Sequence, residues 1–284
     1  MKSKINKTAL VTGCTSGIGL ETCIGLAKQN FNLILISRSD EKLSSLSKEI
    51  IGKYGIKTKC FVCDLSSLKD INKMCIEICN YYNHIDVIIN NAGAIYMDKQ
   101  FSVDGLEMTF ALNHMSYFAL TTNLLENLHN IDDLRIINVS SQAHRNIKID
   151  LDGLDRGDNY NGWFAYKKSK LANIYFTYYM AKKLLGKSIT VNCLHPGVVN
   201  TNIANNNEKL YYKIITSIIK YFSISAKEGA QTSIYLATND LVSNVTGLYF
   251  KNCRPIKTSK VSYDEKVALE LWKKSKRILE KISA

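Results

Sequence analysis

Tyr166 and Lys170 lie four residues apart in a segment with a helical pattern, Phe164-Ala165-Tyr166-Lys167-Lys168-Ser169-Lys170. On a helix, this spacing places a phenol and an ammonium next to each other on one face. A neighbouring cation favours the phenolate, so Lys170 is expected to lower the pKa of Tyr166 from its ordinary value of ~10 and to let the pair exchange protons near neutral pH. Both residue types are frequent in this chain, so the spacing alone is weak evidence for a catalytic pair. The segments that would position the two residues must supply the rest of the evidence.

A glycine-rich turn near the N-terminus has the pattern of an anion site. The predicted strand Thr8-Ala9-Leu10-Val11 runs into Thr12-Gly13-Cys14-Thr15-Ser16-Gly17-Ile18-Gly19, and a helical pattern follows to about Lys28. Strand, turn and helix in this order direct backbone N–H groups and the positive helix end at a pyrophosphate, while glycine allows close approach. A tight turn without a ligand is the alternative interpretation.

Arg38 follows the next predicted strand, residues 32–37, which ends where the ribose of an adenosine must be bound. Neither Ser37 nor Ser39 supplies the acidic side chain that would bind a free ribose 2′-hydroxyl. A guanidinium suits the 2′-phosphate of NADP, so NADP(H) is the expected cofactor. NAD(H) stays open, because Asp40 could contact a ribose and Arg38 could be an ordinary surface arginine.

Apolar runs alternate with helical patterns along the rest of the chain, with further strands predicted at 85–90, 135–141 and 189–194. Each of these strands ends in polar residues or glycine, namely Asn90-Asn91-Ala92-Gly93, Ser140-Ser141 and His195-Pro196-Gly197. Ligands of open parallel sheets collect at the carboxyl ends of strands, so Ser141 and Tyr166 can face one substrate. We expect residues 1–284 to form a single α/β domain, a Rossmann-like doubly wound parallel sheet of about seven strands with helices on both faces.

The formal charge of +12 comes from 37 Lys and Arg against 25 Asp and Glu, which favours anionic partners. The lysines are scattered, and no basic stretch alternates with aromatic residues, so no nucleic-acid partner is expected. Cys60 and Cys63 lie three residues apart on a predicted strand and point to opposite faces, so no metal site is expected. The eight cysteines are expected to be reduced thiols.

The polar segment from Met1 to Lys7 leads directly into the first strand, and no apolar run reaches the ~18 residues that span a bilayer. We therefore expect a cytoplasmic protein without a signal peptide or transmembrane segment. A helix from about Asn207 to Phe222 is predicted to carry an apolar side opposite its lysines. We interpret it as a lid over the substrate pocket, with weak contact to a membrane surface and core packing as alternatives.

Together these motifs resemble the short-chain dehydrogenases/reductases over almost the whole chain. Within that family, Asn113-His114 and the segments 139–144, 169–173, 228–233 and 247–250 are similar to the retinol dehydrogenase and WW-domain oxidoreductase group. The resemblance implies a catalytic tetrad of Asn113, Ser141, Tyr166 and Lys170. It also implies that the cofactor is bound by Gly13, Thr15, Ser16, Gly17, Ile18, Gly19, Arg38, Asp64, Leu65, Asn91, Ala92, Gly93, Tyr166, Lys170, Pro196, Gly197, Val199 and Thr201.

The resemblance further implies hydride transfer between NADP(H) and a carbonyl or alcohol. Tyr166 would give its proton to the developing alkoxide, Ser141 would bond the substrate oxygen, and Asn113 would hold a relay water. Pocket elements are expected at about 144–163 and 198–225, for a lipophilic aldehyde or ketone. Reduction of an activated carbon–carbon double bond, as in protochlorophyllide reductases, and a non-catalytic NADP-binding regulatory protein are the alternatives.

A homodimer is expected from the family and from the predicted helix Ser169–Leu185, which is apolar on more than one side. The dimer would be built on the helices around Asn113 and Tyr166. Burial of both sides within one subunit is the other explanation.

Overall fold

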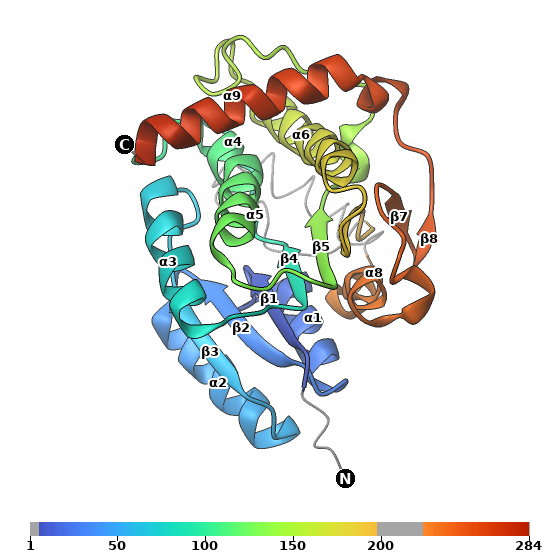
Figure 1. The fold of residues 1–284 in the computed structure, drawn as a ribbon. Coiled ribbons are helices and arrows are strands. Elements are labelled where there is room, and N and C mark those ends of the chain that lie inside the picture. The colour runs from blue at the N-terminus through green and yellow to red at the C-terminus, as the bar shows by residue number, and fades with distance from the viewer. Residues whose placement is uncertain (1–5, 198–223, 284) are drawn as a thin grey trace.

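The computed structural model describes residues 6–197 and 224–283, which form one α/β domain around a central sheet (Figure 1). The strand order is β3-β2-β1-β4-β5-β6-β7-β8. Neighbouring strands from β3 to β7 pair in parallel, and β8 pairs antiparallel with β7. The bounds are β1 Thr8–Thr12, β2 Asn32–Ser37, β3 Thr58–Val62, β4 Val87–Asn90, β5 Leu134–Val139, β6 Ile189–Leu194, β7 Tyr249–Lys251 and β8 Arg254–Pro255. The predicted doubly wound sheet is confirmed, with the short strand β8 as an addition.

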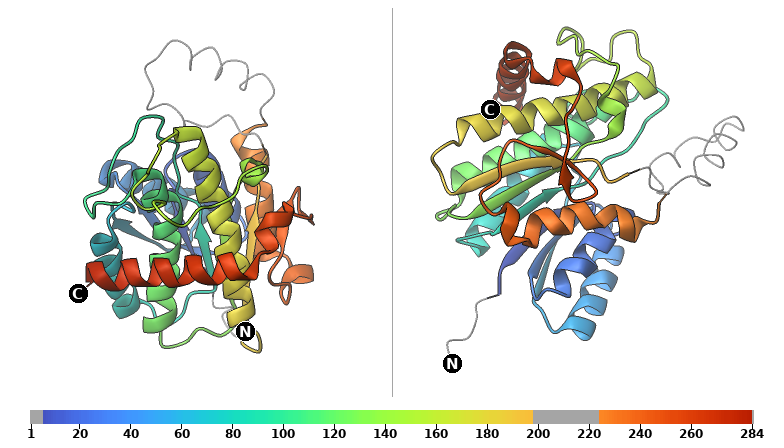
Figure 2. Two further views of the ribbon diagram at one scale, coloured as in Figure 1. Left: turned by 90° about the horizontal axis from the view of Figure 1, so that it is seen from above. Right: turned by 90° about the vertical axis from the view of Figure 1, so that its right-hand side faces the viewer.

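Helices cover both faces of the sheet (Figures 1 and 2). On one face lie α1 (Gly17–Ala27), α2 (Asp40–Tyr54) and α8 (Ala226–Thr238). The other face carries α3 (Leu68–Tyr81), α4 (Met108–Phe110), α5 (Ser116–Asn127) and α6 (Gly162–Lys183), with α9 (Glu265–Ser283) packed outside them. A π-helical turn, η1 (Ala111–Met115), joins α4 to α5, and the short 3-10 turns are η2 (Gln142–His144), η4 (Asp240–Val242) and η5 (Lys260–Tyr263).

Alternate residues of the central strands belong to different cores. In β1, Leu10 packs with the α3, α5 and α6 side, whereas Ala9 and Val11 pack with the α1 and α8 side. Successive side chains of a strand point to opposite faces, and both faces of a parallel sheet are buried. This explains why the strands appear in the sequence as uninterrupted apolar runs.

The C-terminal segment covers the outer face of α6. Trp272 of α9 packs on Tyr179 at 4.9 Å between ring centroids, and the Tyr175 hydroxyl donates to the Val261 carbonyl over 2.7 Å. Figure 2 shows α9 crossing α5 and α6. Burial within one subunit therefore accounts for the second apolar side that the sequence analysis assigned to a dimer interface, and the homodimer stays a prediction.

Part of the predicted site lies outside the described residues. This applies to Val199, Thr201 and the helix predicted at 207–222, and the predicted pocket element 198–225 is described only at residues 224 and 225. Within residues 6–197 and 224–283, no helix has both the length and the apolar composition needed to cross a membrane.

Candidate active site

The turns that follow β1 and β4 are tied together at the carboxyl edge of the sheet. The Thr12 hydroxyl oxygen accepts from the backbone N–H groups of Asn91 (2.9 Å) and Ala92 (3.0 Å), and the Asn91 side-chain amide donates to the Thr12 carbonyl (2.9 Å). The glycine turn is thus held against the Asn-Asn-Ala-Gly turn. Thr12 belongs to the predicted glycine motif, but its hydrogen bonds to the turn after β4 were not predicted.

Two glycines in this turn are required by space and backbone geometry. Gly13 has φ +64°, and a Cβ there would lie 2.9 Å from Cα of Ala92. A Cβ at Gly19 would overlap the carbonyl oxygen of Gly13. Any larger residue would push the N-terminus of α1 away from the turn, so the glycines allow the close approach that an anion site needs.

The N-terminus of α1 has the properties of an anion site. Its N-cap residue, Ser16, makes no side-chain capping hydrogen bond within the described part of the chain, and the first turn carries no acidic residue. In contrast, side chains of Ser39, Ser67 and Asn161 cap α2, α3 and α6. Uncapped N–H groups and the positive helix end suit a phosphate, so the residues present fit the pyrophosphate of a dinucleotide.

The predicted adenosine-side residues lie at the ends of β2 and β3. Arg38 is exposed directly after β2. Burial raises the pKa of Tyr96, whereas the charge of Arg38 and its hydrogen bond oppose that rise, so the guanidinium lies beside this phenol. One carboxylate oxygen of Asp64 accepts from the Ser66 N–H and hydroxyl at 2.9 and 2.8 Å, and Leu65 next to it is buried.

Tyr166 and Lys170 share a buried environment next to β5. The Lys170 amine donates to the Val139 carbonyl over 3.0 Å and lies 5.8 Å from the Tyr166 ring centroid. Burial lowers the pKa of Lys170 to about 7. Burial also raises the pKa of Tyr166, and a hydrogen bond with Ser141 opposes that rise.

The prediction that Lys170 lowers the pKa of Tyr166 is wrong, because burial raises that pKa. Loss of water disfavours the charged form of both side chains, and the amine bonds a carbonyl oxygen instead of the phenol. The spacing of four residues predicted the proximity correctly, but it carried no information on solvent access.

Asn113 lies in the π-helical turn η1, a type of irregularity that is frequent at functional sites. Its side chain accepts from Ala94 N–H (2.9 Å) and donates to the Ala94 carbonyl (2.9 Å) and the Ser169 hydroxyl (3.0 Å). A Cβ added to Gly93 would lie 3.1 Å from Oδ1 of Asn113 and 3.4 Å from Nζ of Lys170. The structure thus brings the Asn-Asn-Ala-Gly turn, Asn113 and Lys170 to one place.

A second chain of hydrogen bonds connects Asn113 to α9. The Asn173 amide donates to the Asn113 carbonyl over 2.8 Å, and its Oδ1 lies 3.2 Å from Nδ1 of His114. Nε2 of His114 lies 3.1 Å from the Ser275 hydroxyl. Asn173 and Ser275 were not predicted as parts of the site, because only tertiary packing brings them there.

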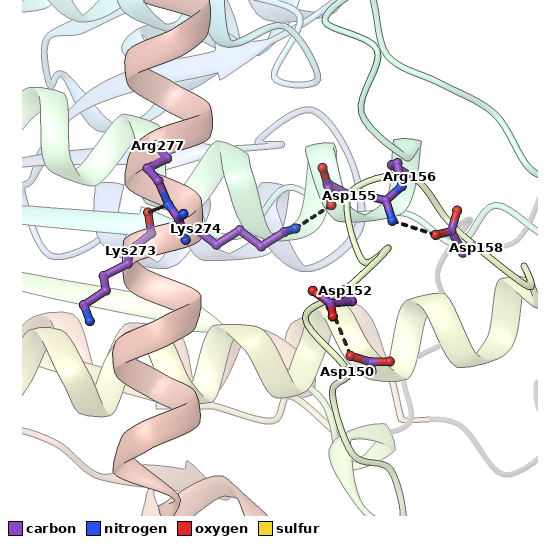
Figure 3. Close-up of polar contacts among 8 residues, drawn as sticks. All are labelled: Asp150, Asp152, Asp155, Arg156, Asp158, Lys273, Lys274 and Arg277. Atoms are coloured by element: carbon purple, nitrogen blue, oxygen red, sulfur yellow. Dashed lines mark hydrogen bonds and ion pairs between the residues drawn. The ribbon is translucent and has the colours of Figure 1, made fainter.

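The insert between Ser141 and Tyr166 runs into the N-terminus of α6 and is fixed from two sides. Asn161 caps α6 by accepting from Phe164 N–H over 3.0 Å, and Trp163 stacks on Tyr166 at 5.7 Å between centroids. On the far side, Lys274 of α9 reaches Asp155 over 2.7 Å (Figure 3). Trp163 is about half exposed, at 46%, so this end of the insert presents aromatic surface beside Tyr166.

Comparison with known proteins assigns the family. The sequence profile described as short chain dehydrogenase matches residues 7–211, which include the glycine turn and the tetrad. The chain belongs to the short-chain dehydrogenase family. It is therefore an oxidoreductase of the type that uses a nicotinamide cofactor, as the sequence analysis predicted.

Several relatives of this short-chain dehydrogenase cover most of its length. It is 36% identical to mouse retinol dehydrogenase 14, over 94% of this chain and 84% of that protein. Human retinol dehydrogenase 13 is 36% identical over 96% of this chain and 84% of its own length. The WW domain-containing oxidoreductase of Drosophila melanogaster is 33% identical over 96% of this chain and 68% of its own length. The predicted resemblance to this group is confirmed.

Solved structures agree with the fold. An uncharacterized protein from Mycobacterium paratuberculosis superimposes with a TM-score of 0.77 at 27% identity, over 96% of this chain and 93% of that one. A short chain dehydrogenase from Burkholderia cenocepacia, solved in complex with NADP, gives a TM-score of 0.70 at 20% identity, over 87% of this chain and 97% of that one. At that identity, the second likeness supports the fold alone.

Proposed function

We propose that this short-chain dehydrogenase transfers hydride between NADP(H) and a lipophilic aldehyde or ketone, or the corresponding alcohol. The observation that carries the proposal is the proximity of three groups in one buried site: Ser141 opposes the rise in the pKa of Tyr166, and the Lys170 amine lies 5.8 Å from the Tyr166 ring centroid. The arrangement provides a proton donor and a second polar group for one substrate oxygen.

A bound nicotinamide supplies or accepts the hydride. Tyr166 holds the proton that a developing alkoxide takes up, and the Ser141 hydroxyl bonds the same oxygen. Lys170 has a pKa of about 7, so at neutral pH its amine can exchange a proton as Tyr166 is reprotonated. Asn113 bonds Ala94, the residue after the turn of residues 90–93, and Ser169 of α6, and thereby keeps these groups in register.

The preference for a lipophilic substrate is supported by the aromatic surface of the insert. The ring of Trp163 is stacked on Tyr166 and remains half exposed, so an apolar group next to a reacting carbonyl would contact it. Several relatives are named retinol dehydrogenases, and retinol is a lipophilic alcohol. The proposed class therefore includes long-chain and isoprenoid aldehydes, without a commitment to retinal.

The preference for NADP(H) is supported by Arg38. Its side chain is exposed directly after β2 and lies beside the buried Tyr96. This neighbour restricts the conformations of the guanidinium. Ser37 and Ser39 are engaged with Thr15 (3.1 Å) and with the capping of α2 (3.3 Å), and neither carries an acidic group. A 2′-phosphate at this point would form a charge-assisted hydrogen bond with the Arg38 guanidinium. NAD has no phosphate at this position and would not form that bond.

The decisive experiment combines product analysis with Tyr166→Phe. The protein is incubated with NADPH and a panel of lipophilic aldehydes, ketones and activated alkenes, and the products are identified. We expect alcohols from the carbonyl compounds, and a loss of turnover of about 10²-fold to 10⁴-fold in Tyr166→Phe, which keeps the ring and removes the proton. Affinity for NADPH is expected to persist.

The matched control is Tyr81→Phe, which removes the hydroxyl of a tyrosine that is 64% exposed and outside the site. Unchanged turnover in Tyr166→Phe would exclude the proposed proton donor. Reduction confined to alkenes would replace the carbonyl assignment, and NADPH binding without any turnover would indicate a regulatory protein.

A further inference from the structure

His144 is a buried histidine that the proposed mechanism does not use. Its side chain is fully buried, and its Nδ1 lies 2.7 Å from the carbonyl oxygen of Ser141. Its Nε2 accepts from the backbone N–H of Ser259 over 3.2 Å. One imidazole ring therefore joins a tetrad residue to the segment that precedes η5.

The two contacts define the protonation state of the ring. A carbonyl oxygen only accepts, so Nδ1 must carry the hydrogen, and a backbone N–H only donates, so Nε2 must be bare. The ring is then neutral, and burial, which lowers the pKa of His144, favours the same form. Both ring nitrogens are satisfied by groups that hold the imidazole in one orientation.

The ring is also fixed by packing and by its neighbour. It contacts Tyr249 of β7 edge-on, at 5.2 Å between centroids. The next residue, Arg145, donates to the Lys257 carbonyl over 2.8 Å. Two successive residues thus attach the end of η2 to residues 257–259, which gives His144 a rigid support.

Fixing the carbonyl of Ser141 restricts the backbone that carries its side chain. Ser141 is the extended N-cap residue of η2, with φ −156° and ψ 153°, and its carbonyl also accepts from the backbone N–H of His144 over 3.2 Å. Rotation about ψ of Ser141 would move the carbonyl oxygen away from Nδ1. The imidazole therefore resists the backbone rotation that would turn Ser141 relative to Tyr166.

We propose that His144 is a positioning residue, which holds Ser141 in catalytic register by donating from Nδ1 to the Ser141 carbonyl while the Ser259 N–H locks its tautomer. This inference rests on the proposed function, in which Ser141 bonds the substrate oxygen. The C-terminal segment around residues 257–259 thereby belongs to the architecture of the active site.

The test compares His144→Asn with His144→Gln in the full-length protein. The amide of asparagine can donate near the position of Nδ1, whereas that of glutamine reaches the position of Nε2 and leaves the Ser141 carbonyl without its side-chain donor. We expect kcat to fall in His144→Gln, by up to roughly 100-fold, with KM unchanged. His144→Asn is expected to recover most of kcat, and His129→Gln, at an exposed histidine, to match the unmodified protein.

Amide hydrogen exchange of residues 141–145 gives a second readout that does not depend on turnover. Exchange is expected to quicken in His144→Gln and to stay slow in His144→Asn. The inference would be overturned if the unmodified protein and both His144 variants had the same kcat and the same exchange rates. It would also be overturned if both variants lost the same amount of kcat and the same amount of unfolding free energy. If the unmodified protein reduced no carbonyl, the proposed function would fail, and the exchange comparison would still decide the role of His144.

Discussion

Lys170 is an amine enclosed by protein, and its contact with the Val139 carbonyl does not replace the water it has lost. Its pKa is lowered to about 7 from 10.5 because burial disfavours the charged form. An unfolded chain keeps this lysine protonated up to its ordinary pKa. Between about pH 7 and pH 10.5 folding therefore releases the proton of Lys170. In this window the contribution of Lys170 to the free energy of unfolding increases as pH rises.

Lys170→Met tests this linkage in the ligand-free protein. Because methionine carries no charge to bury, we expect the variant to be more stable than the unmodified protein at pH 7, by on the order of a few kcal/mol. The difference is expected to shrink as pH approaches 10.5. Urea unfolding of the variant and of the unmodified protein at several pH values measures this difference in free energy of unfolding. Subtracting one protein's value from the other's removes the contribution of the groups that titrate in both. A difference independent of pH would contradict the lowered pKa.

The proposed preference for NADP(H) can be tested at the scale of one side chain, Arg38. Arg38→Ala removes the proposed partner of the 2′-phosphate, so we expect the affinity for NADPH to fall about 10-fold to 100-fold and the affinity for NADH to stay unchanged. Titration of each cofactor against the variant measures both effects. Arg254→Ala, at an exposed arginine of β8, is the matched control. Equal affinity of the unmodified protein for NADPH and NADH would remove the proposed preference.

At the scale of the elements, α9 acts as an outer brace. Trp272 packs against Phe118 of α5, Phe176 of α6 and Tyr179 of α6, with centroid separations of 4.9, 6.0 and 4.9 Å. The same helix reaches the insert through Lys274 and the π-helical turn through Ser275. One amphipathic helix thus touches α5, α6, the insert and the π-helical turn, four elements near the tetrad.

Trp272→Ala tests the brace. Loss of the indole leaves a gap between α9 and two helices, and we expect the free energy of unfolding to fall by about 3 kcal/mol, the lower end for such substitutions because the ring is not fully buried. Urea unfolding measures the change. Lys281→Ala, on the exposed side of the same helix, is expected to change it by less than about 0.5 kcal/mol. Equal stability of both variants would mean that α9 contributes little to the packing.

For the molecule as a whole, the sequence predicted the sheet and the turns at its carboxyl edge well. The strands at 32–37 and 189–194 were predicted with their observed bounds, because apolar runs and turn residues are local signals. The strand predicted at 135–141 ends at Val139 instead, because Ser141 is already the N-cap of η2 and only the Ser140 N–H still bonds β6, at the Leu194 carbonyl.

The contacts that orient the site could not be predicted in this way. His144 and Asn173 stood inside motifs, but their partners, Ser259 and the Asn113 carbonyl, lie far away in the sequence. The raised pKa of Tyr166 likewise depends on how much water the finished fold excludes. Spacing indicates which side chains are neighbours on one helix, whereas burial and second partners arise only when separate elements pack.

The anchoring of the site by the C-terminal segment also has a kinetic meaning. His144 and Ser259 are 115 positions apart, and His114 and Ser275 are 161 apart. Contacts of such separation must close large loops of chain, which makes them slow to form. During refolding, helical secondary structure is therefore expected to return first and catalytic competence last.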